Sequence, residues 1–141
     1  MTPEAARFLE KALTLLTQAD IMLGVGLNES DGRNAYLAAF HAAQAYIFEN
    51  AAKVLKTHNG VQTEFLRLTK DDPRIDAELR LFLSRAYNLK AIADYETGPG
   101  AEVSAERATD AVETGKRFVA LIDERVAARS SDAQPPSGAE Q

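Results

Sequence analysis

Residues 36–55 read YLAAFHAAQAYIFENAAKVL, and this stretch decides the fold. Its apolar side chains recur at intervals of three and four residues, the spacing that places them along one face of an α-helix. A second apolar set runs beside the first, rotated by about 100° around the helix axis. Because two apolar stripes require contacts on two sides, we predict a helix over about residues 31–57 that is either central in a bundle or also meets a second copy of the chain. The stripes are Tyr36, Phe40, Ala43, Ile47, Ala51 and Val54, and Leu37, His41, Ala45, Phe48, Ala52 and Leu55.

Capping residues, prolines and glycines mark out the other helices. Thr2-Pro3 and Asp72-Pro73 each combine an oxygen-bearing cap with a proline, whose missing N–H is harmless in a first turn. Ser104 provides a start for the last helix, and Asn59-Gly60 is typical of a helix stop. No stretch alternates apolar and polar residues long enough to predict a strand. We therefore predict an all-α, up-and-down bundle of four long helices and one short helix. Besides the doubly apolar helix, the predicted helices cover about residues 3–23, 61–70, 73–96 and 104–128.

The chain has 141 residues, which is enough for one domain with one core and too few for two domains. We assign residues 1–128 to the bundle. Residues 129–141, RSSDAQPPSGAEQ, contain no large apolar side chain and include two consecutive prolines. That composition predicts a disordered C-terminal tail.

The composition excludes several classes of chemistry. The sequence has no cysteine, so a disulfide framework, a thiol nucleophile and a thiolate zinc site are excluded. Its two histidines, His41 and His58, do not form an HExxH pattern. The segment Gly24-Val25-Gly26 lacks the preceding strand and the lysine of a phosphate loop. We therefore expect no metal and no cofactor.

Charge and hydropathy argue against a membrane location. The net charge is −5 at pH 7, which disfavours attraction to anionic lipid and also wholesale coating of nucleic acid. The longest uncharged stretch, residues 34–48, is shorter than the ~20 apolar residues that a membrane helix needs. Glu4 and Glu10 stand where a signal peptide carries basic and then apolar residues. We expect a cytoplasmic protein that does not interact with membranes.

A local excess of positive charge lies in the middle of the chain. Residues 33–70 contain five basic and two acidic residues, a net charge of +3 in a chain of −5, together with both histidines. Such a patch can hold the phosphate groups of a nucleotide or of RNA through charge-assisted hydrogen bonds. The alternative is a solvated helical face on which the charges fall by chance.

Three segments of the chain resemble one known family. They are RNAYLAAFHAAQAYIFENAAKVLKTHNGVQTEF at residues 33–65, LSRAYNLKAIADYETG at 83–98, and the helix start VSAE at 103–106. In this order they are similar to the small stand-alone prokaryotic HEPN domains (higher eukaryotes and prokaryotes nucleotide-binding), over roughly residues 5–125. The resemblance implies an all-helical bundle that is commonly dimeric and often encoded beside a minimal nucleotidyltransferase in toxin–antitoxin-like pairs. It also implies a role in RNA- or nucleotide-linked regulation or defence.

Many HEPN domains are metal-independent ribonucleases, and the resemblance implies an arginine and a histidine as the catalytic pair. In the family signature four to six residues separate the two; the histidine moves the proton of the ribose 2′-hydroxyl, and the arginine stabilises the phosphoryl charge. Here Arg33 and His41 are the candidate pair, although seven residues stand between them. Along a helix they differ by about 12 Å of rise and about 80° of rotation. In the later helix, Arg85 is present but no histidine follows it.

Four residues are candidates for binding nucleotide or RNA: Lys53, Lys56, His58 and Arg85. Their side chains supply the positive charge and the hydrogen-bond donors that phosphate groups require. His58 also stands at a predicted helix end, where it can instead cap terminal carbonyls. His41 lies in an alanine-rich stripe and can equally be a packed, hydrogen-bonded histidine of the core or of an interface.

Asp94 and Tyr95 offer a structural interpretation for Arg85. A deeply placed arginine needs a carboxylate, and Asp94 on the same predicted helix is the natural candidate. We therefore predict a buried polar network of Arg85, Asp94 and Tyr95 that locks the fourth helix against the second.

Three functions remain open at this point. We favour a HEPN-type binding module with a degenerate active site, working as a homodimer or with a co-encoded nucleotidyltransferase. The first alternative is a ribonuclease toxin that uses Arg33 and His41. The second is a purely structural dimerisation protein that binds neither nucleotide nor RNA.

Overall fold

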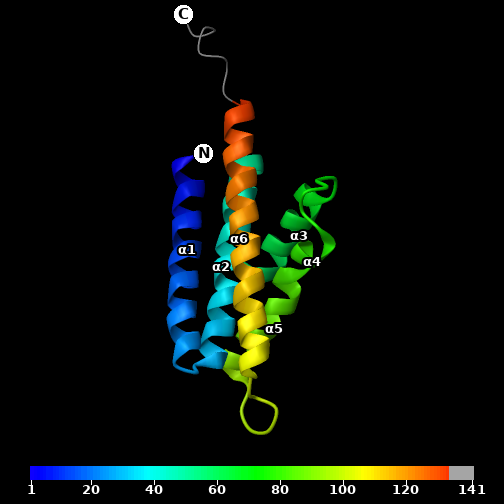
Figure 1. Cartoon of the computed structure of the whole chain (residues 1–141). Helices are drawn as coiled ribbons and strands as arrows, with labels where there is room; N and C mark the ends of the chain where they lie inside the picture. The colour runs from blue at the N-terminus through cyan, green and yellow to red at the C-terminus, as the bar shows by residue number, and fades with distance from the viewer. Residues whose placement is uncertain (134–141) are drawn as a thin grey trace, which may run out of the picture.

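The computed structural model describes residues 1–133 of the chain, and the side chains of residues 1–129. Within these residues the chain forms helices and no strand, so the predicted all-α bundle is confirmed (Figure 1). None of the helices described is long and apolar enough to cross a membrane. The helices are α1 (Pro3–Gly24), α2 (Asn28–Ala51), α3 (His58–Thr69), α4 (Ala77–Arg80), α5 (Phe82–Tyr95) and α6 (Ala105–Ala133).

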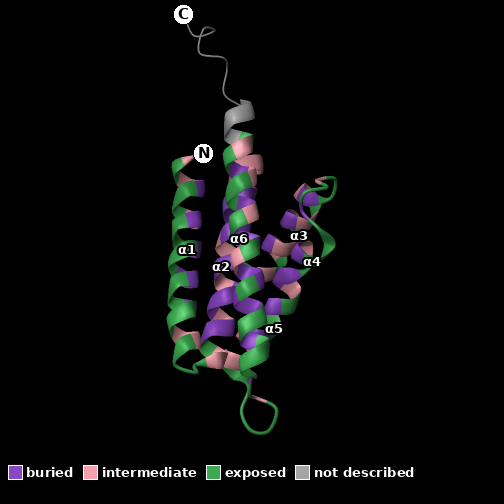
Figure 2. Cartoon of the chain, in the orientation of Figure 1, coloured by how far each residue is buried: buried purple, intermediate pink, exposed green. Residues whose placement is uncertain are grey.

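Helix α2 is the centre of the bundle. It packs against α1, α3, α5 and α6, and Figure 1 shows α1 on one side of it and α3, α4 and α5 on the other. Most of both apolar faces is therefore covered within one chain, as Figure 2 shows by the buried surface along the helix, while Leu37, Phe40 and Phe48 are half-buried. Small side chains allow this close packing, because each alanine lets a neighbouring backbone approach. The fully buried alanines of α2 are Ala35, Ala38, Ala39, Ala42, Ala43 and Ala45.

The end of α2 differs from the prediction. The helix ends at Ala51 rather than near residue 57, and Ala52 adopts a left-handed conformation with φ 53°. Thr57 then caps α3, and its Oγ1 accepts a hydrogen bond from the Gly60 amide at 3.0 Å. The predicted stop at Asn59-Gly60 is therefore wrong, because these residues form the first turn of α3. A Cβ at Gly60 would lie 2.8 Å from the Thr57 Oγ1, so a glycine allows the cap to close.

The predicted helix over about residues 73–96 is interrupted. Asp72 does not cap a helix at Pro73; its carboxylate accepts hydrogen bonds from the Arg74 amide at 3.0 Å and from the Arg125 Nε at 2.9 Å. The true cap is Asp76, whose Oδ1 accepts from the Leu79 amide at 2.9 Å and starts the four-residue α4. The ion pair with α6 thus holds residues 70–76 as a loop, and α5 begins only at Phe82.

Helix α6 closes the bundle against α1 and α2. At Gly115 it approaches closely enough that an added Cβ would lie 3.5 Å from the Leu16 side chain and 3.6 Å from Ala35. The Phe118 ring lies 5.4 Å from that of Phe65 and joins α6 to α3. The helix continues to Ala133, five residues past its predicted end, and the rest of the predicted tail, residues 134–141, lies outside the described residues.

Candidate functional site

A groove of about 310 Å³ opens where α2, α3 and α5 meet the segment 52–57. Helix α2, helix α5, the segment 52–57 and the start of α3 each contribute side chains to its lining. We call it the His58 groove. It is lined by Tyr36, Leu37, Phe40, Lys56, His58, Tyr87 and Lys90.

Three rings form the wall of the His58 groove. The His58 imidazole stacks on the Tyr87 ring at 4.0 Å between centroids and 18° between planes. The Tyr36 ring meets Tyr87 edge-on at 5.5 Å, and its hydroxyl lies 2.8 Å from the His58 Nδ1. Stacking and hydrogen bonding together fix the orientation of the imidazole, which is what a binding or catalytic histidine requires.

Burial determines the protonation states of His58 and Tyr36 in this wall. It lowers the pKa of His58 below the ordinary histidine value, and a hydrogen bond with Gln62 opposes that shift in part. Burial, together with the nearby Tyr87, raises the pKa of Tyr36 far above its usual value. At neutral pH His58 is therefore mostly uncharged and the Tyr36 hydroxyl keeps its proton. That hydroxyl can donate to Nδ1, which places the imidazole proton on Nε2.

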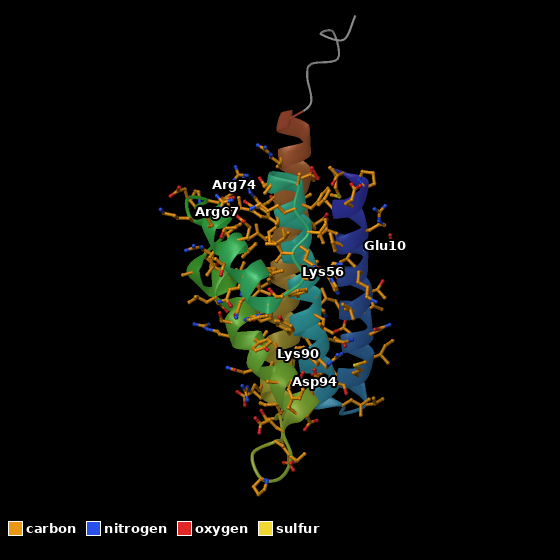
Figure 3. The ribbon with its side chains drawn as sticks, turned by 180° about the vertical axis from the view of Figure 1, so that it is seen from behind. Glu10, Lys56, Arg67, Arg74, Lys90 and Asp94 are labelled. Atoms are coloured by element: carbon orange, nitrogen blue, oxygen red, sulfur yellow. The ribbon has the colours of Figure 1, made fainter. Side chains whose placement is uncertain are left out.

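Two lysines supply the positive charge of the groove. Lys56 is exposed and makes no ion pair with any side chain of residues 1–129. Lys90 is mostly covered and its Nζ lies 2.7 Å from an oxygen of Asp94. Arg33 on α2 approaches the other oxygen of Asp94 at 2.7 Å, so two cations share one carboxylate beside the groove. Lys90 and then Arg33 hold the pKa of Asp94 below its usual range. Figure 3 shows Lys56, Lys90 and Asp94 along this side of the molecule.

The structure places the predicted pair Arg33 and His41 against different helices. Arg33 faces Asp94 of α5, whereas His41 packs against the Phe8 ring of α1 at 6.4 Å. Gln44 Nε2 donates to a backbone carbonyl, so its Oε1 is the acceptor for the His41 Nδ1, which lies 2.7 Å away. Burial lowers the pKa of His41. It is thus a hydrogen-bonded, partly buried histidine, and neither member of the pair lines the His58 groove.

The four predicted binding residues divide into two groups. Lys56 and His58 line the His58 groove. Lys53 points away from it and pairs with Glu64 of α3 at 2.7 Å. Arg85 lies on the side of α5 that faces α6 and lines a different groove. His58 does not cap α2, as the capping interpretation required, because it is the first residue of α3.

The polar network around Asp94 contains other residues than predicted. Asp94 does join α5 to α2, but its arginine partner is Arg33 rather than Arg85. Tyr95 is 75% exposed and contacts the network through its ring, 5.3 Å from the Lys90 Nζ. The prediction was wrong because Asp94 and Arg85 lie on different sides of α5. The network is partly exposed and flanks the His58 groove.

Tyr87 and Lys90 are groove residues that the sequence did not identify as binding residues. Tyr87 and Lys90 are three residues apart and so share a face of α5, a spacing that also describes ordinary packing. Their relation to Lys56 and His58 arises only when α5 and α3 both pack on α2. Among residues 1–129 no group of three or more His, Asp or Glu side chains is placed to hold a metal ion.

Comparisons with known proteins agree on the architecture. The family model of the HEPN domain matches residues 5–125. The crystal structure of TT1696 from Thermus thermophilus superimposes with a TM-score of 0.74 at 20% sequence identity. The superposition covers 87% of this chain and 98% of TT1696, and at that identity it shows a shared fold. No curated protein matches the sequence.

Proposed function

Because this chain belongs to the HEPN domain family, we propose that it is a nucleotide- or RNA-binding module and that the His58 groove is its binding site. The family is associated with ribonuclease and nucleotide-related toxin–antitoxin roles. The observation that carries the proposal is the meeting of two lysines with a stacked ring wall in one groove.

Each part of the groove suits a part of a nucleotide. Lys56 and Lys90 supply charge for phosphate, and a neutral His58 supplies a donor at Nε2. The stacked rings of His58 and Tyr87 form an aromatic surface of the kind on which bases stack in single-stranded nucleic acid complexes. The volume of about 310 Å³ lies within the range of small-ligand pockets. A local positive site also explains how a chain of net charge −5 can hold an anion.

Binding is tested with a matched pair of lysine variants. Lys56→Ala and Lys53→Ala remove the same charge from the same short segment, but only Lys56 lines the groove. Fluorescence anisotropy of a labelled single-stranded RNA, with AMP as competitor, measures the affinity at low salt. We expect Lys56→Ala to weaken binding about tenfold, because one charge-assisted hydrogen bond contributes about 1.5 kcal/mol. Lys53→Ala is expected to have little effect. Equal effects of the two variants, or failure of the wild type to bind either probe, would contradict the proposal.

A metal-independent endoribonuclease is the second candidate, and the position of His58 favours it. In the tautomer whose Nδ1 donates to the Tyr36 hydroxyl oxygen, the neutral imidazole has a free lone pair on Nε2 and can take the proton of a ribose 2′-hydroxyl. The 2′-oxygen then attacks the adjacent phosphorus and displaces the 5′-oxygen of the next nucleotide, which takes up a proton from the imidazolium. Lys56 and Lys90 would stabilise the phosphoryl charge. The alternative pair, Arg33 and His41, would need to act on one phosphate from different sides of α2.

Cleavage of RNA in the presence of EDTA distinguishes these mechanisms. Loss of cleavage in His58→Gln with retention in His41→Gln assigns the reaction to the His58 groove. The reverse pattern assigns it to the Arg33–His41 pair. Absence of cleavage in the wild type leaves the binding role, and absence of binding as well leaves a purely structural dimerisation protein.

The proposal includes a protein partner. We propose that the module works as a homodimer or with a co-encoded minimal nucleotidyltransferase, because HEPN domains often act as dimers or with partners. Co-elution of the purified chain with the product of a neighbouring nucleotidyltransferase gene tests the second arrangement.

A further inference from the structure

A second groove, of about 330 Å³, separates α5 from α6. The two helices run in opposite directions in Figure 1, and both pack far more extensively on α2 than on each other. We call it the α5–α6 groove. Apolar side chains at its base include Phe82, Ala86, Leu89 and Ala111. Each of them is nearly buried within the chain, so the base of the groove consists of core side chains.

The rims of the α5–α6 groove carry charges of both signs. Arg85 and Glu78 lie on the α4–α5 side, and Arg107 and Asp110 lie on the α6 side. Arg85, Arg107 and Asp110 have no ion-pair partner among residues 1–129, while Glu78 meets Arg117 at 3.7 Å. The groove therefore has no net charge but holds three exposed charges without a counter-charge.

The charges of the α5–α6 groove indicate what kind of partner it fits. A phosphate polymer requires a positive surface, and the two carboxylates of the α5–α6 groove would repel it. A surface that carries equal numbers of both signs, with the unpaired Arg85 on α5 and the unpaired Asp110 on α6, can pair with a second copy of itself. Symmetric association of two identical chains uses such a self-complementary patch on both copies.

The groove between α1 and α6 is the main competitor, because Leu13 is exposed beside it. Its lysine, Lys116, already pairs with Asp20 at 2.8 Å within the chain. Its charges therefore gain less from a partner than those of the α5–α6 groove. Leu13 provides a test variant for this competing surface.

We propose that the α5–α6 groove is the surface through which two copies of this chain associate. A twofold axis parallel to the groove brings α5 of each copy against α6 of the other and sets Arg85 near the partner's Asp110. A standard interface buries about 800 Å² per copy, which is about a tenth of the 7899 Å² accessible surface of this chain. The inference rests on the self-association in the proposed function and does not depend on RNA binding.

A charge-swap experiment tests the interface. Sedimentation velocity of the full chain between about 5 and about 200 µM measures self-association of the wild type and variants. Arg85→Glu gives the groove excess negative charge, and we expect it to weaken the dimer by more than about tenfold, because like charges across an interface repel. Adding Asp110→Arg restores the balance and should restore the dimer. Arg74→Glu, a charge reversal on the exposed loop before α4, is the matched control and should leave the dimer intact. Circular dichroism confirms that each variant is folded.

The outcomes separate this inference from the proposed function. A wild type that stays monomeric up to the highest concentration overturns the interface, and so does a dimer that survives Arg85→Glu. Loss of the dimer in Leu13→Glu but not in Arg85→Glu assigns it to α1 and overturns the inference as well. RNA anisotropy with the wild type is a separate measurement: a monomer that binds RNA refutes the interface alone, and a dimer that binds no RNA refutes the proposed site alone.

Discussion

Replacing Asp31 by asparagine should stabilise the protein at neutral pH. Asp31 is fully buried in the first turns of α2, and neither of its carboxyl oxygens has a well-formed hydrogen bond. Burial raises the pKa of Asp31 from 3.8 to about 6; the Gly32 amide lowers it in part, and Glu29 adds to the increase. Asp31→Asn has nearly the same shape and carries no charge at any pH, so it removes the cost of burying a carboxylate.

The size of the effect follows from the two pKa values. The native state binds the Asp31 proton more tightly than the unfolded state, so the free energy of unfolding falls as the pH rises from about 4 to about 6. A difference of about two pKa units corresponds to about 3 kcal/mol. Above about pH 7 this loss is complete. The asparagine variant should therefore match the wild type near pH 4 and exceed it by about 3 kcal/mol near pH 7.

Urea denaturation of both proteins across this pH range measures the difference directly. Subtracting the wild type from the variant cancels the contributions of all other titrating groups. Asp123→Asn, an exposed position on α6, makes the same change in net charge and should show no such pH dependence. A difference that does not change with pH, or a variant less stable than the wild type at neutral pH, would refute this account of Asp31.

Three further predictions concern the groove, a helix end and the core. RNA binding should strengthen as the pH falls below the ordinary histidine pKa, because protonation of His58, whose pKa burial lowers, adds a positive charge to the groove. Anisotropy titrations should show a flat profile in His58→Gln; a slope that persists there contradicts the assignment. Ala52→Gly should raise the free energy of unfolding by about 0.5–1 kcal/mol, since glycine adopts the left-handed conformation at φ 53° without strain, and a urea midpoint that falls would disprove it. Phe65→Ala should lower the free energy of unfolding by about 3–5 kcal/mol, because the fully buried ring packs on Tyr46 and Phe118. A loss below about 1 kcal/mol in urea denaturation would show that the site collapses around the smaller side chain.

Much of the fold follows from local chemistry that the sequence displays. The caps at Thr2 and Ser104 form as predicted, with the Thr2 Oγ1 accepting from the Ala5 amide at 3.2 Å and the Ser104 Oγ accepting from the Arg107 amide at 3.1 Å. The central position of α2 also follows, because two apolar stripes on one helix need two covered sides. These features depend on residues within one or two helical turns of each other.

The helix boundaries were predicted wrongly where contacts with distant residues, or a local change in backbone conformation, determine the end of a helix. Asp72 was predicted to cap a helix, but its carboxylate pairs with Arg125 of α6, and Asp76 is the cap instead. Asn59-Gly60 was predicted to end a helix, but the left-handed Ala52 places the break earlier, and Thr57 caps the helix that contains both residues. The spacing of apolar residues predicts that a helix is present, but it does not show at which of several neighbouring residues the helix begins or ends.

The candidate site was less accessible from the sequence than the fold. Lys56 and His58 were identified by charge, but Tyr87 and Lys90 join them only through packing on α2. Asp31 was not identified at all. An acidic residue in a first helical turn is ordinarily exposed and stabilised by the helix dipole, and only the tertiary structure buries this one.

The chain between α2 and α3 brings one part of the groove lining in from outside the long helices. Lys56 and His58 lie at the end of a six-residue connection that is fastened by the Gln44 bond to the Leu55 carbonyl and by the Thr57 cap. Exchanging the residues of that connection that make neither of these contacts leaves both attachments in place. Such an arrangement allows ligand preference to diverge between related proteins while the scaffold is conserved in shape. For protein engineering, the same connection is the place to insert a new specificity with little loss of stability.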